Sequence, residues 1–193
     1  MAVPLTEYLT AKGSYEGFDI VPEAIRWCRR AIGRRHPNFG FKVADLYNKT
    51  YNPGGRYHAH EFPFPYPDGS FDFVILTSVF THLLPRDTDH YLAEISRVLV
   101  PGGRMFGTFF LLNEESLRLI AGGKSERAFA HELPDCRVDN LHVPEDAVAY
   151  DEAFILGLVA RHGLSIPGPI RYGKWCGRTP WTSFQDIVVA VKE

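Results

Sequence analysis

Short apolar runs alternate along this chain with longer stretches in which apolar residues recur every three or four positions. The short runs predict strands, and the spaced positions predict the inward faces of helices. Alternation of strands and helices favours a parallel α/β sheet. We therefore expect an α/β fold, a three-layer α/β/α sandwich. The predicted strands are 14–20, 39–44, 71–77, 104–112, 165–175 and 184–191, and the predicted helices are 4–11, 22–34, 85–99, 114–119 and 152–162.

Local signals refine this outline. Asn113 can cap the short helix that follows it, and Asp87 or Thr88 is a plausible cap for the helix at 85–99. The strand at 71–77 is nearly all apolar, which is typical of a central parallel strand buried on both faces. The last two predicted strands are expected to pair antiparallel. Residues 121–149 show no clear period.

The connection at 47–70 is unusually long and rich in aromatic residues, proline and glycine. Long ordered connections are often functional, so we expect it to fold over one end of the sheet. Within it, His58 and His60 could share one side of an extended segment and suit a metal. A third ligand at convincing spacing is missing, so we predict a surface loop and no metal site.

Composition limits the functional classes. The length suits one domain, residues 1–193. A net charge of -2 gives no electrostatic footprint for nucleic acid or an anionic membrane. The three cysteines are widely spaced, which argues against a zinc site or a disulfide framework and fits a reducing cytosol. No apolar run approaches the roughly 20 residues that span a bilayer. We expect a cytoplasmic protein.

Asp19 is the most informative single residue. It ends a short strand and precedes a helix opened by Pro22. In nucleotide-binding α/β folds an acid at this point accepts hydrogen bonds from ribose hydroxyls, about 20 residues after a glycine-rich turn. Counting back from Asp19 by that spacing runs past Met1, and no G-x-G-x-x-G precedes it. We expect the native start to lie upstream; a true fragment or a degenerate relative are the alternatives.

Five motifs follow one another in a recognisable order: Gly-Phe-Asp-Ile-Val-Pro-Glu-Ala-Ile (17–25), Val-Ala-Asp-Leu (43–46), Pro-Asp-Gly-Ser-Phe-Asp-Phe-Val (67–74), Ser-Val-Phe-Thr-His-Leu (78–83) and Glu-Ile-Ser-Arg-Val-Leu-Val-Pro-Gly-Gly (94–103). Together they resemble the class I S-adenosylmethionine-dependent methyltransferases of the type 11 group. The resemblance implies a Rossmann-like sheet whose first strand is missing from this chain. Residues 1–112 correspond to the cofactor-binding part, and residues 113–193 to a C-terminal helix and closing strand pair.

The resemblance implies transfer of a methyl group from S-adenosylmethionine to a small-molecule acceptor. Position by position, it assigns Asp19 to the ribose hydroxyls and Asp45 to the adenine amino group. Ile20 matches a residue that packs on the adenine. Ala44 and Leu46 match the residues that wall the ring.

The substrate side of the implied site follows the strand at 71–77. Thr77 and Ser78 match positions whose backbone groups face the methionine part, and Phe80 and His82 lie where the family's site opens to substrate. His82 is the candidate catalytic base, since neutral imidazole can take a proton from a hydroxyl or amine. A packed or cofactor-contacting histidine is an equal alternative, because methyl transfer depends largely on positioning.

Two other functions stay open. Without the first strand and the glycine-rich turn, we expect this exact chain to be marginally stable and to bind S-adenosylmethionine weakly or not at all. It could also be a non-catalytic interaction module that lost the turn and survives through a partner. An NAD-dependent dehydrogenase shares the acid after the second strand, but the Ser-Phe-Asp strand and the Pro-Gly-Gly turn weigh against it. The DNA upstream of the start codon discriminates between the methyltransferase and the interaction module. The substrate and the oligomeric state cannot be predicted.

Overall fold

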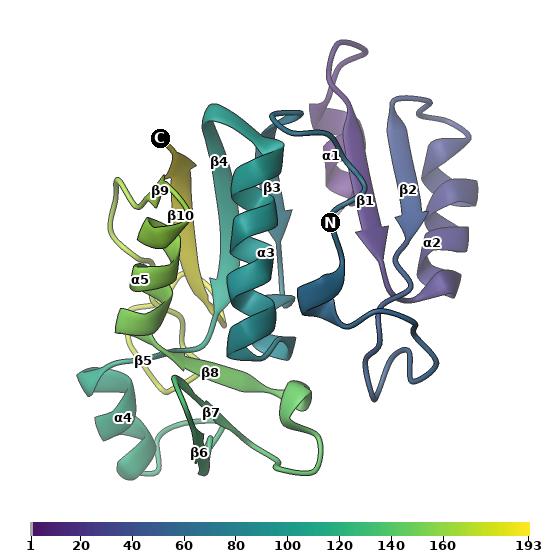
Figure 1. Ribbon diagram of the computed structural model, residues 1–193. Coiled ribbons are helices and arrows are strands. Elements are labelled where there is room, and N and C mark those ends of the chain that lie inside the picture. The colour runs from purple at the N-terminus through teal and green to yellow at the C-terminus, as the bar shows by residue number, and fades with distance from the viewer. Residues whose placement is uncertain (1) are drawn as a thin grey trace. The chain divides into compact units, whose positions relative to one another are not determined.

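The computed structural model describes residues 2–193. The chain forms two compact units, one ending at His58 and the other comprising Ala59–Glu193 (Figure 1). Each unit is built around its own sheet or sheets, with helices packed on them. The predicted single domain therefore consists of two units.

The first unit contains a sheet of two parallel strands, β1 (Tyr15–Asp19) and β2 (Phe39–Val43), aligned from Tyr15 opposite Phe39 to Asp19 opposite Val43. Helix α1 (Ala2–Tyr8) precedes β1, and α2 (Pro22–Cys28) continues as a π-helical turn, Arg29–Gly33, before β2. The helices and strands share one buried cluster: Ala2, Ile25, Ile32, Phe39 and Phe41. These elements agree with the apolar pattern of the sequence.

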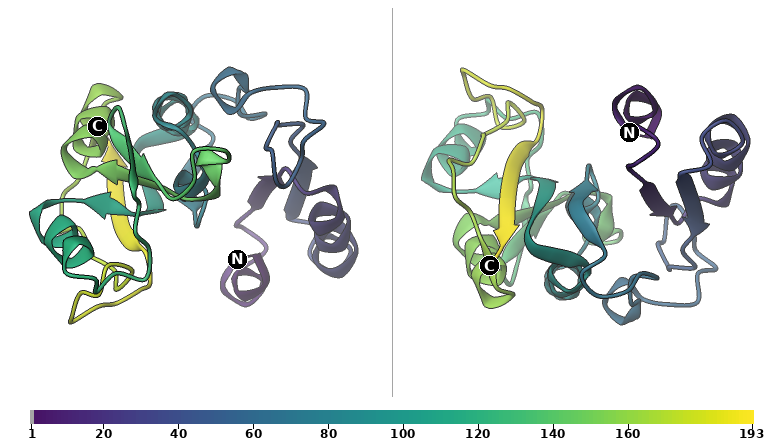
Figure 2. Two further views of the ribbon diagram at one scale, coloured as in Figure 1. Left: turned by 90° about the horizontal axis from the view of Figure 1, so that it is seen from below. Right: turned by 90° about the horizontal axis from the view of Figure 1, so that it is seen from above.

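The second unit contains a four-stranded sheet in the order β3-β4-β10-β9. Its strands are β3 (Phe71–Leu76), β4 (Leu99–Phe109), β10 (Asp186–Lys192) and β9 (Leu164–Ser165). β3 and β4 are parallel, and β10 runs antiparallel to both β4 and β9. Helices α3 (Pro85–Val98) and α5 (Glu152–Arg161) cover one face of this sheet (Figures 1 and 2). The antiparallel closing pair is confirmed, although its first strand is much shorter than predicted.

β3 is not the buried central strand that its apolar sequence predicts. Among the described residues 2–193, β4 is its only strand partner, so β3 lies at the edge of the sheet. Phe73 is consequently 50% exposed. The prediction failed because an apolar run reports the hydrophobicity of a strand, whereas burial depends on the elements that pack beside it.

A second sheet of the same unit was not predicted. Its order is β5-β8-β7-β6, formed by β5 (Leu111–Leu112), β8 (Val148–Asp151), β7 (Cys136–Val138) and β6 (His131–Leu133). Strands of two to four residues are too short to establish a period, which is why no periodic pattern marks residues 121–149. Helix α4 (Glu114–Ala121) begins after Asn113, whose side chain accepts from the Ser116 amide as predicted.

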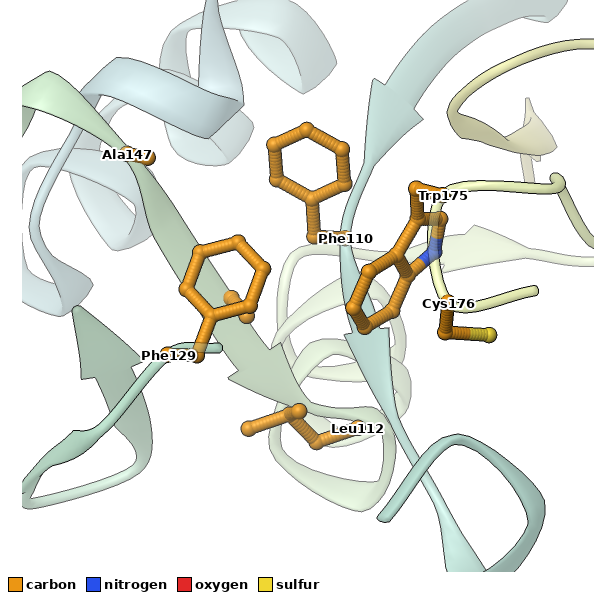
Figure 3. Packing of buried hydrophobic residues seen from close by; sticks show 7 residues of the cluster. Phe110, Leu112, Phe129, Ala147, Trp175 and Cys176 are labelled. Carbon is orange, nitrogen blue, oxygen red and sulfur yellow. The ribbon is translucent and has the colours of Figure 1, made fainter. Parts of the chain in front are cut away.

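Aromatic side chains fill the space beside this second sheet (Figure 3). Phe110 packs against both Phe129 and Trp175, with ring centroids 5.3 Å apart in each case. Phe129 and Trp175 are themselves in contact at 5.5 Å. Leu112, Ala147, Ala149 and Cys176 complete the cluster. The segment before β10 is thereby fixed to the second sheet.

The start of α3 differs from the prediction. Leu84 is the N-cap residue, and Asp87 lies inside the first turn. The Asp87 carboxylate accepts from the Leu84 amide at 3.4 Å and from the His60 amide at 3.0 Å. Asp87 thus stabilises the helix start from within and attaches the preceding connection to it.

Residues 59–70 lie along α3 rather than over one end of the sheet. His60 contacts the first turn of α3, and the Ser70 amide donates to the carbonyl oxygen of Val98 at the other end of the helix. Between them, the Arg97 guanidinium donates to the carbonyl oxygens of Phe64 and Tyr66. This half of the predicted cover is therefore a strap along a helix.

Candidate functional site

The first unit carries one set of candidate residues at the carboxyl ends of β1 and β2. Asp19 is exposed, and its Oδ1 accepts from the Val21 amide at 2.8 Å, which turns the chain into α2. The Ala44 amide donates to the carbonyl oxygen of Asp19 at 3.0 Å. This bond continues the β1–β2 pairing and brings Asp19 beside Asp45. Two carboxylates therefore occupy neighbouring strand ends.

The residues around Asp45 differ in exposure. Asp45 is exposed, and its Oδ1 accepts from the Arg56 amide at 3.3 Å. Ala44 and Leu46 are buried within the unit, so their side chains pack inward. Ile20 is half-buried at the end of β1. Of the three predicted adenine neighbours, Ile20 is the one with a partly exposed side chain.

The second unit carries the other set, after β3. Ser78 has a φ of 54°, a left-handed conformation that is uncommon for a residue with a side chain. Its amide donates to Thr108 Oγ1 at 2.8 Å, and its hydroxyl donates to Gln185 Oε1 at 3.1 Å. Two segments distant in sequence therefore hold Ser78 in place. Strained backbone of this kind clusters at functional sites.

Phe80 does not lie at an opening. Its side chain is fully buried, and its ring stacks on Phe109 with centroids 4.4 Å apart and planes 13° apart. The sequence interpretation assigned Phe80 to substrate contact. Its burial makes Phe80 instead a packing residue, whose ring attaches the segment that carries Ser78 and His82 to Phe109 of β4.

His82 ends the 3-10 turn Phe80–His82 and is half-buried. Its Nδ1 lies 2.9 Å from the carbonyl oxygen of Glu145. A carbonyl oxygen can only accept, so Nδ1 carries the proton, and the neutral ring has its lone pair on Nε2. The backbone partner thus selects the tautomer in which Nε2 is the basic atom.

Tyr150 on β8 forms hydrogen bonds with the backbone of the same turn. Its hydroxyl contacts the carbonyl oxygens of Phe80 and Leu83 and the hydroxyl of Thr88. Complete burial raises the pKa of Tyr150 far above its usual range, so the phenol stays neutral and can donate. The second sheet therefore positions the turn that carries His82.

Sequence reasoning missed these supporting residues. Thr108 and Gln185 are 30 and 107 positions from Ser78, and Tyr150 is 70 positions from Phe80. No local pattern links residues so far apart. Asp19, Ile20, Ala44, Asp45 and Leu46 belong to the first unit, and Thr77, Ser78, Phe80 and His82 belong to the second.

Residues 2–107 match the family model described as a methyltransferase domain. The match spans more than half of the chain and includes the strand ends that carry Asp19, Asp45 and Ser78. The chain therefore belongs to the methyltransferase domain family, a class of S-adenosylmethionine-dependent enzymes.

Solved structures of methyltransferases share the fold. An S-adenosylmethionine-dependent methyltransferase from Methanosarcina mazei is 20% identical, with a TM-score of 0.60 over 97% of this chain and 86% of that chain. Magnesium protoporphyrin IX methyltransferase from Synechocystis PCC 6803, solved with S-adenosylhomocysteine, is 16% identical, with a TM-score of 0.56 over 99% and 68%. The predicted Rossmann-like methyltransferase fold is thus confirmed.

A third structure contains both kinds of ligand. It is the 1,6-didemethyltoxoflavin-N1-methyltransferase of Burkholderia thailandensis, with 1,6-didemethyltoxoflavin and S-adenosylhomocysteine bound. It is 15% identical to this chain, with a TM-score of 0.52 over 92% of this chain and 60% of that chain.

Within residues 2–193 of the present protein, no helix is long and apolar enough to cross a membrane.

Proposed function

We propose that this protein transfers the methyl group of S-adenosylmethionine to a small-molecule acceptor. The observation that carries the proposal is the pair of carboxylates, Asp19 and Asp45, on neighbouring parallel strand ends joined by the Ala44–Asp19 hydrogen bond. Ligands of open α/β sheets bind at the carboxyl ends of the strands. The small molecule bound by the Burkholderia enzyme supports an acceptor of that size.

The chemistry of the first set of residues fits an adenosine group. A carboxylate has about four lone-pair sites, so Asp19 can accept from ribose hydroxyls as well as from the Val21 amide. Asp45 is exposed and can accept from the adenine amino group. Ile20 offers an apolar contact for the ring. When bound, S-adenosylmethionine supplies a methyl group on a sulfonium that is already activated toward nucleophiles.

The second set of residues serves the acceptor and the methionine part. Ser78, held by Thr108 and Gln185, presents backbone groups at the end of β3 together with Thr77. His82 receives the acceptor's proton at Nε2, since Nδ1 is committed to the Glu145 carbonyl. Most of the rate enhancement then comes from alignment of the two reactants.

Binding of S-adenosylhomocysteine tests the proposal. An NMR titration of the full chain measures dissociation constants up to the millimolar range, so even weak binding is quantified. Asp19→Ala should weaken binding by roughly 10- to 100-fold, the equivalent of a charge-assisted hydrogen bond. Asp72→Asn, an exposed acid at the amino end of β3, is the matched control and should leave the affinity unchanged. Equal binding by Asp19→Ala and the wild type removes Asp19 from the site.

A further inference from the structure

The segment that precedes β10 lines a cavity of the second unit that is widely open to solvent. Its volume is about 330 Å³, and residues 178–182 line it together with Glu115, Arg171 and Tyr172. Ligand sites for small molecules usually begin at roughly 300 Å³. The cavity is therefore large enough for a single aromatic ring with substituents.

The cavity lies at the same edge of the sheet as Ser78. β10 begins at Asp186, opposite Phe109 at the carboxyl end of β4. The residue before it, Gln185, accepts from the Ser78 hydroxyl, while Asp186 accepts from Arg178 at 3.2 Å. One dipeptide thus connects the turn after β3 to the cavity wall, on the side where α/β sheets bind ligands.

Arg178 forms a fixed and electrically compensated wall. Its side chain is 4% exposed, and it donates to Glu115 at 2.7 Å and to Asn113 at 2.8 Å in addition to Asp186. Its guanidinium stacks over the ring of Tyr172 at 4.4 Å. Because two carboxylates, Glu115 and Asp186, pair with this one guanidinium, it shapes the cavity without supplying free positive charge.

Trp181 and Arg171, which are exposed and line the cavity, define the chemistry of a ligand together with the neighbouring Lys174. Trp181 is 53% exposed, which is unusual for an indole, and Lys174 Nζ lies 5.0 Å above its ring. In the described residues 2–193, neither Lys174 nor Arg171 forms an ion pair with a carboxylate. An exposed indole that already holds one cation over its ring, beside the unpaired guanidinium of Arg171, suits a flat ring that carries an anionic group.

We propose that this cavity binds the methyl acceptor, and that the acceptor is a planar aromatic acid whose ring packs on Trp181 and whose acid group pairs with Arg171. The proposal rests on the proposed methyltransferase function. Binding of the acid alone, without the methyl donor, can be measured separately from methyl transfer.

The test is an NMR titration of the full chain with three probes, following the indole Nε1–H signal of Trp181, assigned with Trp181→Phe. The probes are 4-hydroxybenzoate, its uncharged analogue 4-hydroxybenzamide, and cyclohexanecarboxylate, which has the acid but no flat ring. We expect 4-hydroxybenzoate to bind tightest of the three. Arg171→Gln should weaken its binding about tenfold, roughly the effect of one charge-assisted contact, and leave 4-hydroxybenzamide unchanged. The matched control Arg104→Gln alters an exposed arginine in the middle of β4, opposite Val191 near the far end of β10.

Each outcome decides the inference. Loss of 4-hydroxybenzoate affinity in Arg171→Gln, with none in Arg104→Gln, supports it. Equal affinity for the acid and the amide, or equal affinity in the wild type and Arg171→Gln, overturns the acidic group. A Trp181 signal that none of the probes moves, in a protein with a dispersed spectrum, overturns the cavity as a ligand site. Binding of the acid by a protein that binds no S-adenosylhomocysteine would contradict the proposed function while supporting the cavity as a site for aromatic acids.

Discussion

The hydroxyl of Tyr150 lies 2.9 Å from the carbonyl oxygen of Phe80, 70 positions away in the chain. This contact joins the second sheet to the turn that carries His82. A phenol has one proton to donate and can accept from Thr88, so the carbonyl oxygens of Phe80 and Leu83 share that single donor. The position of the candidate base therefore depends on a strand that the sequence pattern did not reveal.

Replacing this hydroxyl should destabilise the protein. Tyr150→Phe removes the donor and leaves two buried carbonyl oxygens and the Thr88 hydroxyl without it, at a cost of about 1–3 kcal/mol. Urea unfolding of the second unit measures the change. Tyr8→Phe, at a residue that is 80% exposed, is the control and should have no effect. Equal midpoints for Tyr150→Phe and the wild type would show that the hydroxyl does not hold the turn.

The tautomer of His82 follows from its backbone partner. We expect the neutral ring to carry its proton on Nδ1, because the Glu145 carbonyl oxygen only accepts. Long-range ¹H–¹⁵N NMR of histidine rings at alkaline pH identifies the tautomer, and His82→Gln assigns the signal. A proton on Nε2 would contradict this arrangement and remove Nε2 as the acceptor of the substrate's proton.

Acid should weaken the attachment of the strap, residues 59–70, to helix α3. Burial raises the pKa of the Glu94 carboxyl, but hydrogen bonds from Arg97 and the Phe64 amide outweigh it and hold the pKa below the usual 4.5. Because the folded-state pKa is lowered, the ionised carboxylate stabilises the native state fully above the unfolded-state pKa. This stabilisation is lost as the pH falls through the folded-state pKa. We expect Glu94→Gln to flatten the pH dependence of unfolding between about pH 5 and pH 3.

Asp68 provides the control for the Glu94 experiment. It pairs with the same guanidinium at 2.7 Å, but its side chain is 80% exposed. Exposed ion pairs contribute little, so Asp68→Asn should change the free energy of unfolding by less than about 0.5 kcal/mol and keep the acid dependence. A similar acid dependence in Glu94→Gln and Asp68→Asn would assign the effect to another carboxyl group.

The first unit should open before the large sheet of the second. Two strands form its whole sheet, and an isolated strand pair is only marginally stable. Hydrogen exchange measures this: backbone amides of β1 and β2 should exchange well before those of β4 and β10, which pair along most of their length. Equal protection of the two sets of amides would contradict the prediction.

Elements with strong local signals could be predicted from the sequence alone. Pro22 began α2 where predicted, Asn113 capped α4, and Gly163, with a φ of 67°, follows the last helix. Such residues act through their own backbone preferences, which need no distant partner. Asp19 was likewise identified from its place between a strand and a proline-opened helix, and the order of motifs identified the family that the comparison confirmed.

Features that depend on contacts between distant segments could not be predicted from the sequence. The exposure of Phe73, the burial of Phe80 and the short strands of the second sheet follow from packing that an apolar pattern does not specify. The strained backbone of Ser78 persists because Thr108 and Gln185 hold it from 30 and 107 positions away. Local propensity is a property of neighbouring residues, whereas burial and site geometry are properties of the folded whole.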